Sequence, residues 1–370
     1  MTFPLQENKH RILFLVAHRP GRSPGQRFRF EQYLHHLQQN GFDCQVSWLI
    51  SEKDDPIFYA NGKYLAKLLF LVRSLWKRFS DLRRVRQFDI VFLYREAHML
   101  GTTFFERQIR RKGVKMVVDF DDSIWLRDVS NGNKKLAFLK RPSKTADIVA
   151  MCNAVIVGNQ YLADYSLVFN PHVHIIPTTL DTETYLPVQR SEENRPVCIG
   201  WTGSSTTIKH FSLAVPVLQQ IRQKYGEQVV FRVISDEFFD GHLEGLENIR
   251  WNKETELDDL ASIDIGIMPL PDDAWARGKC GFKGLQYMAL AKPAVMSPVG
   301  VNNEIIRHGE NGFLAQDQKQ WFDLLCQLID DPQLRSRMGE KGRKTVVERF
   351  SFQSQKDRYL DIFKQLVAKS

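Results

Sequence analysis

Short apolar segments alternate with longer amphipathic ones along the whole chain. Residues 11–17 (RILFLVA) are apolar after the first position, which is typical of a strand buried on both faces of a parallel sheet. A turn rich in glycine and proline follows at 19–25, and apolar residues between 30 and 37 then recur at the spacing of one helix face. Residues 44–50 again have the pattern of a strand. The chain therefore opens with a strand, a glycine-containing loop, a helix and a second strand, which is the order of an α/β unit.

The same alternation continues to residue 176. Strands are predicted at 89–94, 115–118, 154–157 and 174–176, and helices at 103–112 and after Asn159. A polar segment with two prolines then runs from 182 to 196 and has the composition of an interdomain linker.

Beyond this segment the pattern restarts. Strands are predicted at 197–201, 229–234, 263–268 and 294–296, and helices at 211–224, 257–262, 282–290, 322–329 and 353–367. We therefore expect an α/β fold with two Rossmann-like domains. The expected boundaries are 1–185 for the first domain and 186–350 for the second, and 351–370 is expected to be a C-terminal helix that crosses back to the first domain.

Composition narrows the class of protein. The chain has 370 residues, which at about 150 residues per domain agrees with two domains. Its formal net charge of +8 favours an anionic partner such as a nucleic acid, an anionic membrane surface or a phosphorylated small molecule. The five cysteines are scattered without CxxC spacing, so neither a disulfide framework nor a zinc site is expected. With no signal-peptide pattern at the N-terminus and no apolar stretch long enough to span a bilayer, we expect a cytoplasmic protein.

Two predicted loops lie between a strand and a helix, where unpaired N–H groups and the positive end of the helix dipole attract anions. They are residues 21–27 (GRSPGQR) and residues 202–209 (TGSSTTIK). Residues of these loops that could bind an anion or allow it to approach the backbone closely are Gly25, Arg27, Gly203, Ser204 and Lys209. Neither loop matches a complete phosphate-binding motif, so an ordinary α/β turn remains the alternative for each.

A third candidate is the segment 277–286 (RGKCGFKGLQ) at the start of a predicted helix. Lys279 and Lys283 bracket this start. Because the helix dipole is itself positive there, two cations are unfavourable unless an anion lies between them. The segment therefore indicates a phosphate site, with a solvated pair of surface lysines as the alternative.

Three carboxylates crowd the end of a predicted strand at 119–122 (DFDD), the edge at which open α/β sheets bind ligands. Asp119 and Asp121 have the spacing of a divalent-metal pair. Carboxylates are also strong acceptors for sugar hydroxyls. Metal binding, sugar binding and a helix cap with surface charge all remain open from the residues alone.

A strongly basic segment runs from 63 to 86. It carries eight lysines and arginines against one acid, Asp81, with Leu, Val, Phe and Trp residues interleaved. This is the composition of a helix that lies on an anionic membrane surface. A core helix with a solvated basic face is the alternative.

The C-terminal half resembles the GT-B glycosyltransferases of retaining family 4, the glycosyl transferases group 1. The stretches that carry the resemblance are 202–209, 263–270 (IDIGIMPL), 279–299 (KCGFKGLQYMALAKPAVMSPV) and 302–314 (NNEIIRHGENGFL). In the N-terminal half, 94–96 (YRE), 118–125 (VDFDDSIW) and 154–162 (AVIVGNQYL) resemble one subgroup of these enzymes.

The resemblance implies two Rossmann-like domains that face a cleft, and a sugar transfer that retains the anomeric configuration without a metal or a cofactor. The C-terminal domain would hold a nucleotide-diphosphate-sugar donor, and the N-terminal domain an acceptor. By position, Lys209 and Lys283 would neutralise the diphosphate with Lys279 in support. Asp122 or Asp121 is expected to face the cleft, and Asp122 is the candidate for a further catalytic residue, with its role left open. The other donor-binding positions would be Gly203, Ser204, Gly281, Phe282 and Gln286, and the acceptor-side loop would present Gly25, Arg27 and Asp121.

One departure from the family pattern affects the donor site. The family usually has two glutamates eight positions apart, and Gly278 and Gln286 stand at the matching positions. Gln286 can accept a hydrogen bond from a ribose hydroxyl, but without the charge of a glutamate. A non-catalytic relative that binds sugar nucleotides or membrane surfaces is therefore one alternative.

A second alternative is a metal-dependent GT-A transferase that uses Asp119 and Asp121. The two Rossmann-like halves argue against it, since GT-A enzymes have one such domain. We expect no nucleic-acid partner, because no nucleic-acid motif is present and a diphosphate and an anionic membrane account for the positive charge. The expected acceptor is a glycan or a lipid-linked glycan of polysaccharide biosynthesis, reached at the cytoplasmic face of the membrane through residues 63–86.

Overall fold

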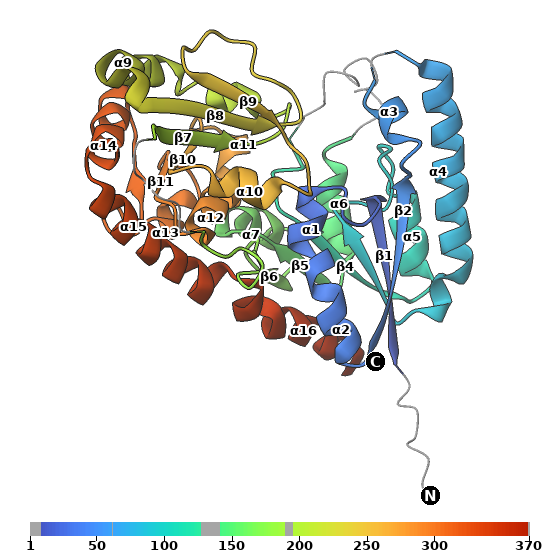
Figure 1. Ribbon diagram of the computed structural model, residues 1–370. Coiled ribbons are helices and arrows are strands. Elements are labelled where there is room, and N and C mark those ends of the chain that lie inside the picture. The colour runs from blue at the N-terminus through green and yellow to red at the C-terminus, as the bar shows by residue number, and fades with distance from the viewer. Residues whose placement is uncertain (1–8, 61, 127–140, 189–194, 369–370) are drawn as a thin grey trace, which may run out of the picture. The chain divides into compact units, whose positions relative to one another are not determined.

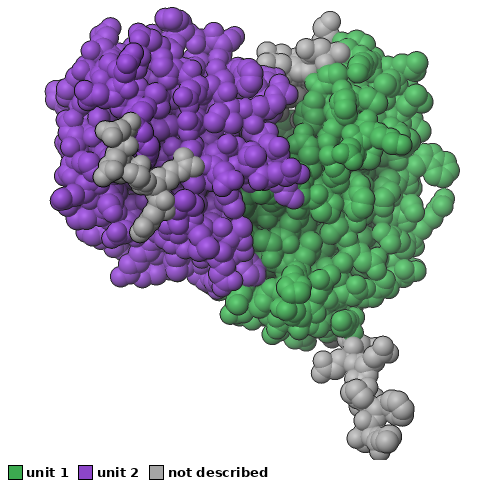
Figure 2. All heavy atoms as spheres, in the orientation of Figure 1, with its two compact units in different colours: residues 1–178, 356–370 green, residues 179–355 purple. Residues whose placement is uncertain are grey.

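The computed structural model describes residues 9–60, 62–126, 141–188 and 195–368. The chain forms two compact units, which Figure 2 shows in different colours. Unit 1 comprises Met1–Thr178 together with Lys356–Ser370, and unit 2 comprises Thr179–Gln355.

Unit 1 is built on a six-stranded parallel sheet in the order β2-β1-β3-β4-β5-β6. Its strands are β1 (His10–His18), β2 (Phe42–Ile50), β3 (Ile90–Tyr94), β4 (Lys115–Phe120), β5 (Ala154–Val157) and β6 (Val173–Ile175). The central strands β3, β4 and β5 are buried along nearly their whole length, which is why they appear in the sequence as apolar runs.

Helices lie on both faces of this sheet (Figure 1). They are α1 (Pro24–Arg29), α2 (Leu34–Gln39), α3 (Asp55–Phe58), α4 (Tyr64–Arg84), α5 (Phe104–Arg111), α6 (Lys144–Met151), α7 (Gln160–Leu167) and the end of α16 (Phe352–Ala368). Helices α1, α2 and α16 share one face, where the ring of Tyr359 stacks on Tyr33 with centroids 4.2 Å apart. Helices α4, α5 and α6 share the other face, as right-handed crossovers require.

Unit 2 has a second six-stranded parallel sheet in the order β12-β11-β10-β7-β8-β9. Its strands are β7 (Val197–Thr202), β8 (Val229–Ser235), β9 (Leu246–Arg250), β10 (Ile265–Met268), β11 (Ala294–Met296) and β12 (Phe313–Leu314). Its helices are α8 (Ile208–Phe211), α9 (Val215–Tyr225), α10 (Glu256–Ala261), α11 (Ala274–Arg277), α12 (Phe282–Ala289), α13 (Asn302–Ile305), α14 (Gln318–Asp330) and α15 (Pro332–Thr345).

Close packing in unit 2 brings α12 directly onto β10. A Cβ atom at Gly266 of β10 would lie 2.1 Å from the ring of Tyr287 of α12, so only glycine allows this approach. The Tyr287 hydroxyl accepts a hydrogen bond from the backbone N–H of Thr202, the last residue of β7, at 2.9 Å. The start of α12 and the loop after β7 are therefore held at the same carboxyl edge of the sheet, where α/β folds bind ligands.

The expected fold class is confirmed: the chain is α/β, with one parallel Rossmann-like sheet in each unit. Several short elements were not predicted, and neither were the longer α6, β9 and α15. The unit boundary also falls at 178/179 rather than at 185/186, because Leu180 pairs with Ser351 and Arg343 donates to the Tyr185 carbonyl, all within unit 2. Residues 189–194 of the predicted linker lie outside the described residues.

Candidate functional site

Three lysines of unit 2 lie around one buried histidine, His210. Lys209 and His210 belong to α8, Lys279 precedes α12, and Lys283 lies in its first turn. Burial and the positive charges of Lys283, Lys279 and Lys209 together lower the pKa of His210 to about 4, against a smaller opposing effect of the Asp273 carboxylate. His210 is therefore neutral at pH 7, and the charge at this edge of unit 2 comes from the three lysines.

Aromatic rings lie against two of these lysines. The Lys283 ammonium lies 5.5 Å from the ring centroid of the fully buried Trp201. The Lys279 ammonium lies 5.2 Å from the ring centroid of Trp275. Such cation–π contacts restrict the lysine side chains and keep both charges at the start of α12.

The backbone at the start of α12 requires glycine. Gly281 is the N-cap residue and has a left-handed φ of 67°, and a Cβ there would lie 2.2 Å from Ile305. Phe282 follows at the first helical position and is half-buried. Gly281 and Phe282 thus shape the turn on which Lys279 and Lys283 are placed.

The loop after β7 differs from the expectation in one respect. The N–H of Gly203 donates to the Ile234 carbonyl at 3.0 Å, and that of Ser204 to the Thr207 hydroxyl at 3.0 Å. The N–H of Ser205 donates to Asp236 at 2.6 Å. These three groups are already paired inside unit 2, and α8 is a single turn. The lysines, and not the loop amides, therefore supply the attraction for an anion.

Gln286 lies in the interior of unit 2. Its side chain is 4% exposed, and its amide nitrogen lies 3.4 Å from the Tyr185 hydroxyl. Gly278 is the C-cap residue of α11 and is also buried. The two positions that depart from the family pattern are thus both enclosed, and the ribose-binding role of Gln286 stays a prediction.

In unit 1, Asp119 is the innermost of the three carboxylates. Its side chain and that of Arg29 are both 0% exposed, and they form an ion pair of 2.9 Å. Burial raises the pKa of Asp119 to about 6, although Arg29 opposes the rise. A carboxylate enclosed against an arginine is poorly placed to coordinate a metal at the surface, which argues against Asp119 as a metal ligand.

Asp121 and Asp122 meet at Arg95. The Arg95 guanidinium donates to Asp121 at 2.9 Å and to Asp122 at 2.7 Å, and the Tyr94 hydroxyl donates to Asp121 at 2.9 Å. Burial raises the pKa of Asp121, but Arg95 and Arg29 outweigh burial and hold it below its usual value. Among the described residues, no group of three or more His, Cys, Asp or Glu side chains is placed to hold a metal ion.

The acceptor-side residues lie beside this cluster. Gly25, in α1, is so close to Tyr94 that a Cβ would lie 2.1 Å from the Tyr94 hydroxyl. Arg27 lies two residues after Gly25 in α1, and its guanidinium is 4.8 Å from the Phe28 ring centroid. Tyr94 thus links Gly25 and Asp121, and the acceptor-side role of the two residues stays a prediction.

A pocket of about 390 Å³ opens at the carboxyl ends of β1, β2 and β3 in unit 1. Gly25, Arg95 and Glu96 contribute polar groups to its wall, and His18 and Tyr59 stack there with ring centroids 6.2 Å apart. Burial and the nearby Arg22 lower the pKa of His18 to about 4, so this ring is neutral at pH 7. His18 and, in unit 2, His210 were not singled out by the sequence, because an isolated histidine carries no spacing signal.

Comparison with known proteins agrees with this architecture. Residues 196–331 match the model of the family described as glycosyl transferases group 1. An 81-residue segment is 33% identical to N-acetyl-alpha-D-glucosaminyl L-malate synthase of Bacillus anthracis and covers 21% of each chain. The matched segments span between 21% and 53% of the length of the curated relatives.

Two solved structures share the fold over almost the whole chain. Sucrose-phosphate synthase from Thermosynechococcus elongatus superposes with a TM-score of 0.69 at 13% identity, covering 98% of this chain and 100% of the other. HepE of Anabaena, solved in complex with UDP and glucose, superposes with a TM-score of 0.62 at 13% identity, covering 96% and 99%.

The fold is therefore that of the GT-B glycosyltransferases. Within this fold, residues 196–331 match the glycosyl transferases group 1 family.

Proposed function

We propose that the protein transfers a sugar from a nucleotide-diphosphate sugar to an acceptor, with retention of the anomeric configuration and without a metal or cofactor. The observation that carries the proposal is the group of three lysines around the neutral His210 at the carboxyl edge of the unit 2 sheet. UDP is our first choice of nucleotide, since HepE, a structural neighbour, was solved with it.

The three lysines have a direct chemical role in this proposal. When the bond between the anomeric carbon and the phosphate oxygen breaks, its electron pair stays on the diphosphate, which gains negative charge. Lys283 and Lys209, with Lys279 in support, would stabilise that charge in the transition state more than in the bound donor, which is the condition for catalysis. Gly203, Ser204, Gly281, Phe282 and Gln286 would shape the rest of the donor site.

The acceptor would bind in the pocket of unit 1. The acceptor hydroxyl oxygen forms the new bond to the anomeric carbon, and its proton passes to a phosphate oxygen of the departing nucleotide diphosphate. Arg95 and Gly25 line this pocket, and Arg95 pairs with Asp122 beside it. We therefore assign Asp122 to orienting this hydroxyl as a hydrogen-bond acceptor, with Asp121 and Arg27 as further acceptor-side residues outside the pocket lining. A glycan or a lipid-linked glycan handled in the cytoplasm is the proposed acceptor.

The test is a donor panel. The full chain is incubated with UDP-, GDP- and ADP-sugars and a membrane extract as the acceptor source, and release of the nucleotide diphosphate and the anomeric configuration of the product are measured. We expect turnover with one nucleotide, a product with the configuration of the donor, and loss of turnover in Lys283→Ala. Lys319→Ala is the matched control, because Lys319 is an exposed lysine of α14 that pairs with Asp323.

The buried Gln286 motivates a second candidate, a non-catalytic relative that binds sugar nucleotides. It predicts that a nucleotide sugar binds in a manner sensitive to Lys283→Ala while no donor on the panel is turned over. Turnover that disappears in Lys283→Ala rejects this candidate.

A further inference from the structure

Helix α4 has its polar and apolar sides reversed relative to an ordinary surface helix. The side chains that it buries in unit 1 are Lys67, Phe70, Ser74, Arg78 and Asp81. The large side chains that it exposes are mainly apolar: Tyr64, Leu65, Leu68, Leu69, Val72, Trp76 and Phe79. The exposed fraction reaches 72% for Leu65 and 68% for Trp76. A contiguous apolar row of this size on a protein surface marks an interaction site.

The buried polar side fixes this orientation. The Arg78 side chain, 1% exposed, donates to the carbonyls of Ala97 at 2.6 Å and Val16 at 2.7 Å, and pairs with Asp81 at 3.0 Å. The Asp81 carboxylate also accepts from the Ser47 hydroxyl at 2.6 Å. Rotation of α4 to bury its leucines would leave the buried carbonyls of Ala97 and Val16 and the Ser47 hydroxyl without these partners, at a cost in free energy. The apolar row therefore faces outward in the folded protein.

Cations lie next to the apolar row. Arg73 and Lys77, one position beyond Val72 and Trp76, are exposed along the flank of α4. At its end, Phe79 meets Phe104 of α5 with ring centroids 5.8 Å apart, so the two helices share one surface. A helix with an apolar row and flanking cations is the composition of an interfacial element on anionic lipid.

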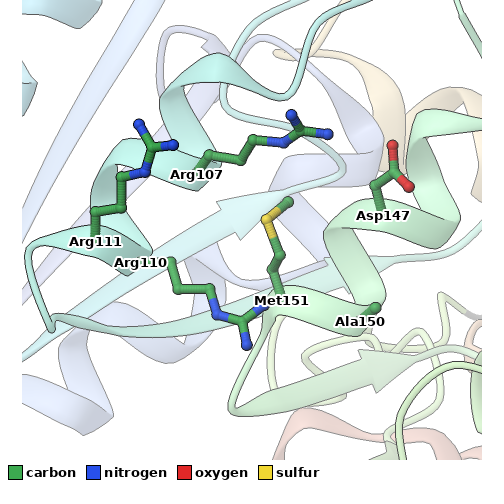
Figure 3. A pocket seen from close by; sticks show the side chains of 6 residues that line it. All are labelled: Arg107, Arg110, Arg111, Asp147, Ala150 and Met151. Atoms are coloured by element: carbon green, nitrogen blue, oxygen red, sulfur yellow. The ribbon is translucent and has the colours of Figure 1, made fainter.

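Helix α5 continues this surface with three exposed arginines, Arg107, Arg110 and Arg111. Together with Asp147, Ala150 and Met151 of α6 they line a surface pocket (Figure 3). Figure 3 shows Arg107 and Arg110 extending toward α6. Asp147 pairs with Arg141 at 2.6 Å, and within the described parts of the chain none of the three guanidiniums forms an ion pair. Three arginines this close together suit a phosphate-bearing ligand.

We propose that the outer surface of α4 and α5 docks on a bilayer that contains anionic phospholipids. Leu65, Leu68, Leu69, Val72 and Trp76 enter the acyl region, and the arginines of α5 bind headgroup phosphates. No helix of the described residues is long and apolar enough to cross a bilayer, so the contact is made at the surface. Charge complementarity favours anionic lipid over a second copy of the chain, since a second copy would place its own α4 and α5 cations next to the same cations of the first.

The inner side of α4 connects the docking surface with the proposed acceptor pocket. Lys67, Phe70 and Leu71 of α4 line the 390 Å³ pocket that we assign to the acceptor. The helix that rests on lipid is thus one wall of that pocket. The acceptor is then a lipid-linked glycan whose headgroup reaches the pocket while its lipid stays in the membrane. This assignment of the acceptor rests on the proposed function, whereas the docking of α4 and α5 on the bilayer does not.

Flotation with vesicles tests the docking without any donor or acceptor. The full chain is mixed with vesicles of phosphatidylcholine alone and of phosphatidylcholine with phosphatidylglycerol in equal parts. We expect flotation with the anionic vesicles. Leu68→Ser/Trp76→Ser should lose it, and Arg107→Gln/Arg111→Gln should weaken partitioning by roughly tenfold or more. Phe238→Ser and Arg337→Gln, at exposed positions of unit 2, are the matched controls and should float like the parent chain.

Three results would overturn the proposal: no flotation with anionic vesicles, flotation that both double variants retain, or binding that ignores lipid charge. A fourth would redirect it to a second copy: a dimer by mass measurement that Leu68→Ser/Trp76→Ser converts to a monomer, with no vesicle binding. Because the changed side chains are exposed, thermal unfolding should match the parent chain and exclude misfolding. Flotation without sugar transfer would mean that the docking holds and the proposed function fails. Sugar transfer without flotation would mean the reverse.

Discussion

The buried ion pair between Arg29 and Asp119 offers a sharp test of how unit 1 is held together. Both side chains are fully buried, and the pair joins α1 to the end of β4. The perturbation is Arg29→Met, which keeps the length of the side chain and removes the charge. Removal of one partner of a buried pair typically costs about 3–5 kcal/mol, because the other charge is left without compensation.

The pKa of Asp119 sets the pH dependence of this loss. Its pKa rises from an ordinary value of 3.8 to about 6 in the folded protein. The folded state therefore holds the proton more tightly, so the contribution of Asp119 falls as pH rises from 3.8 to 6, by about 3 kcal/mol over the window. Without Arg29, which lowers this pKa, the carboxyl should stay protonated to still higher pH. The loss in Arg29→Met should therefore be smaller at pH 5 than at pH 8.

The assay is urea denaturation of the parent chain, Arg29→Met and Arg29→Met/Asp119→Asn at both pH values. The double variant has no buried charge and should recover most of the loss at pH 8. Arg11→Met, which breaks the half-exposed pair with Asp43, should cost less than about 1 kcal/mol. A loss below about 1 kcal/mol in Arg29→Met, or no recovery in the double variant, would refute the reasoning.

Three further predictions concern the two sites. The His210 ring, followed by NMR, should titrate near pH 4 in the free protein. It should titrate at higher pH once UDP is added, because the negative diphosphate offsets the charge of the lysines. A pKa that UDP leaves unchanged would mean that the diphosphate binds elsewhere. Gly25→Ala should destabilise unit 1 by about 1–3 kcal/mol in urea denaturation, and Gly25→Ala/Tyr94→Phe should recover part of this because the clashing hydroxyl is gone. Tyr287→Phe should cost about 1–3 kcal/mol in the same assay, since it leaves the buried Thr202 N–H unpaired, and a cost near zero would contradict the role of that bond.

The central strands and the two-unit architecture could be predicted from the sequence because apolar runs report burial on both faces of a sheet. The elements that were missed lack this signal. Strand β9 (Leu246–Arg250) is a half-exposed edge strand with polar residues, and α15 (Pro332–Thr345) has only two large apolar side chains. Both depend on contacts with neighbouring elements that a local pattern does not contain.

The same limit applies to the sites. The lysines at the start of α12 could be predicted because their effect is local, through the helix dipole. The pairing of Asp119 with Arg29, 90 positions away in the chain, could not, and neither could the pairing of the Ser205 amide with Asp236. The reversed polarity of α4 also escaped prediction. Its buried arginine and aspartate are stabilised by Ser47 and by backbone carbonyls of three separate segments, so burial there does not follow hydrophobicity.

The most direct test of the central claim is the affinity of unit 2's lysines for a nucleotide diphosphate. Isothermal titration of the full chain with UDP, GDP and ADP identifies the nucleotide that binds best, and the titration is repeated with Lys283→Ala, Lys209→Ala and the control Lys319→Ala. We predict that Lys283→Ala and Lys209→Ala each weaken binding by about 10- to 100-fold, as the loss of a charge-assisted contact requires, and that the control has no effect. Equal affinity in all four proteins, or no binding of any nucleotide, would contradict the assignment of this edge of unit 2 as the donor site.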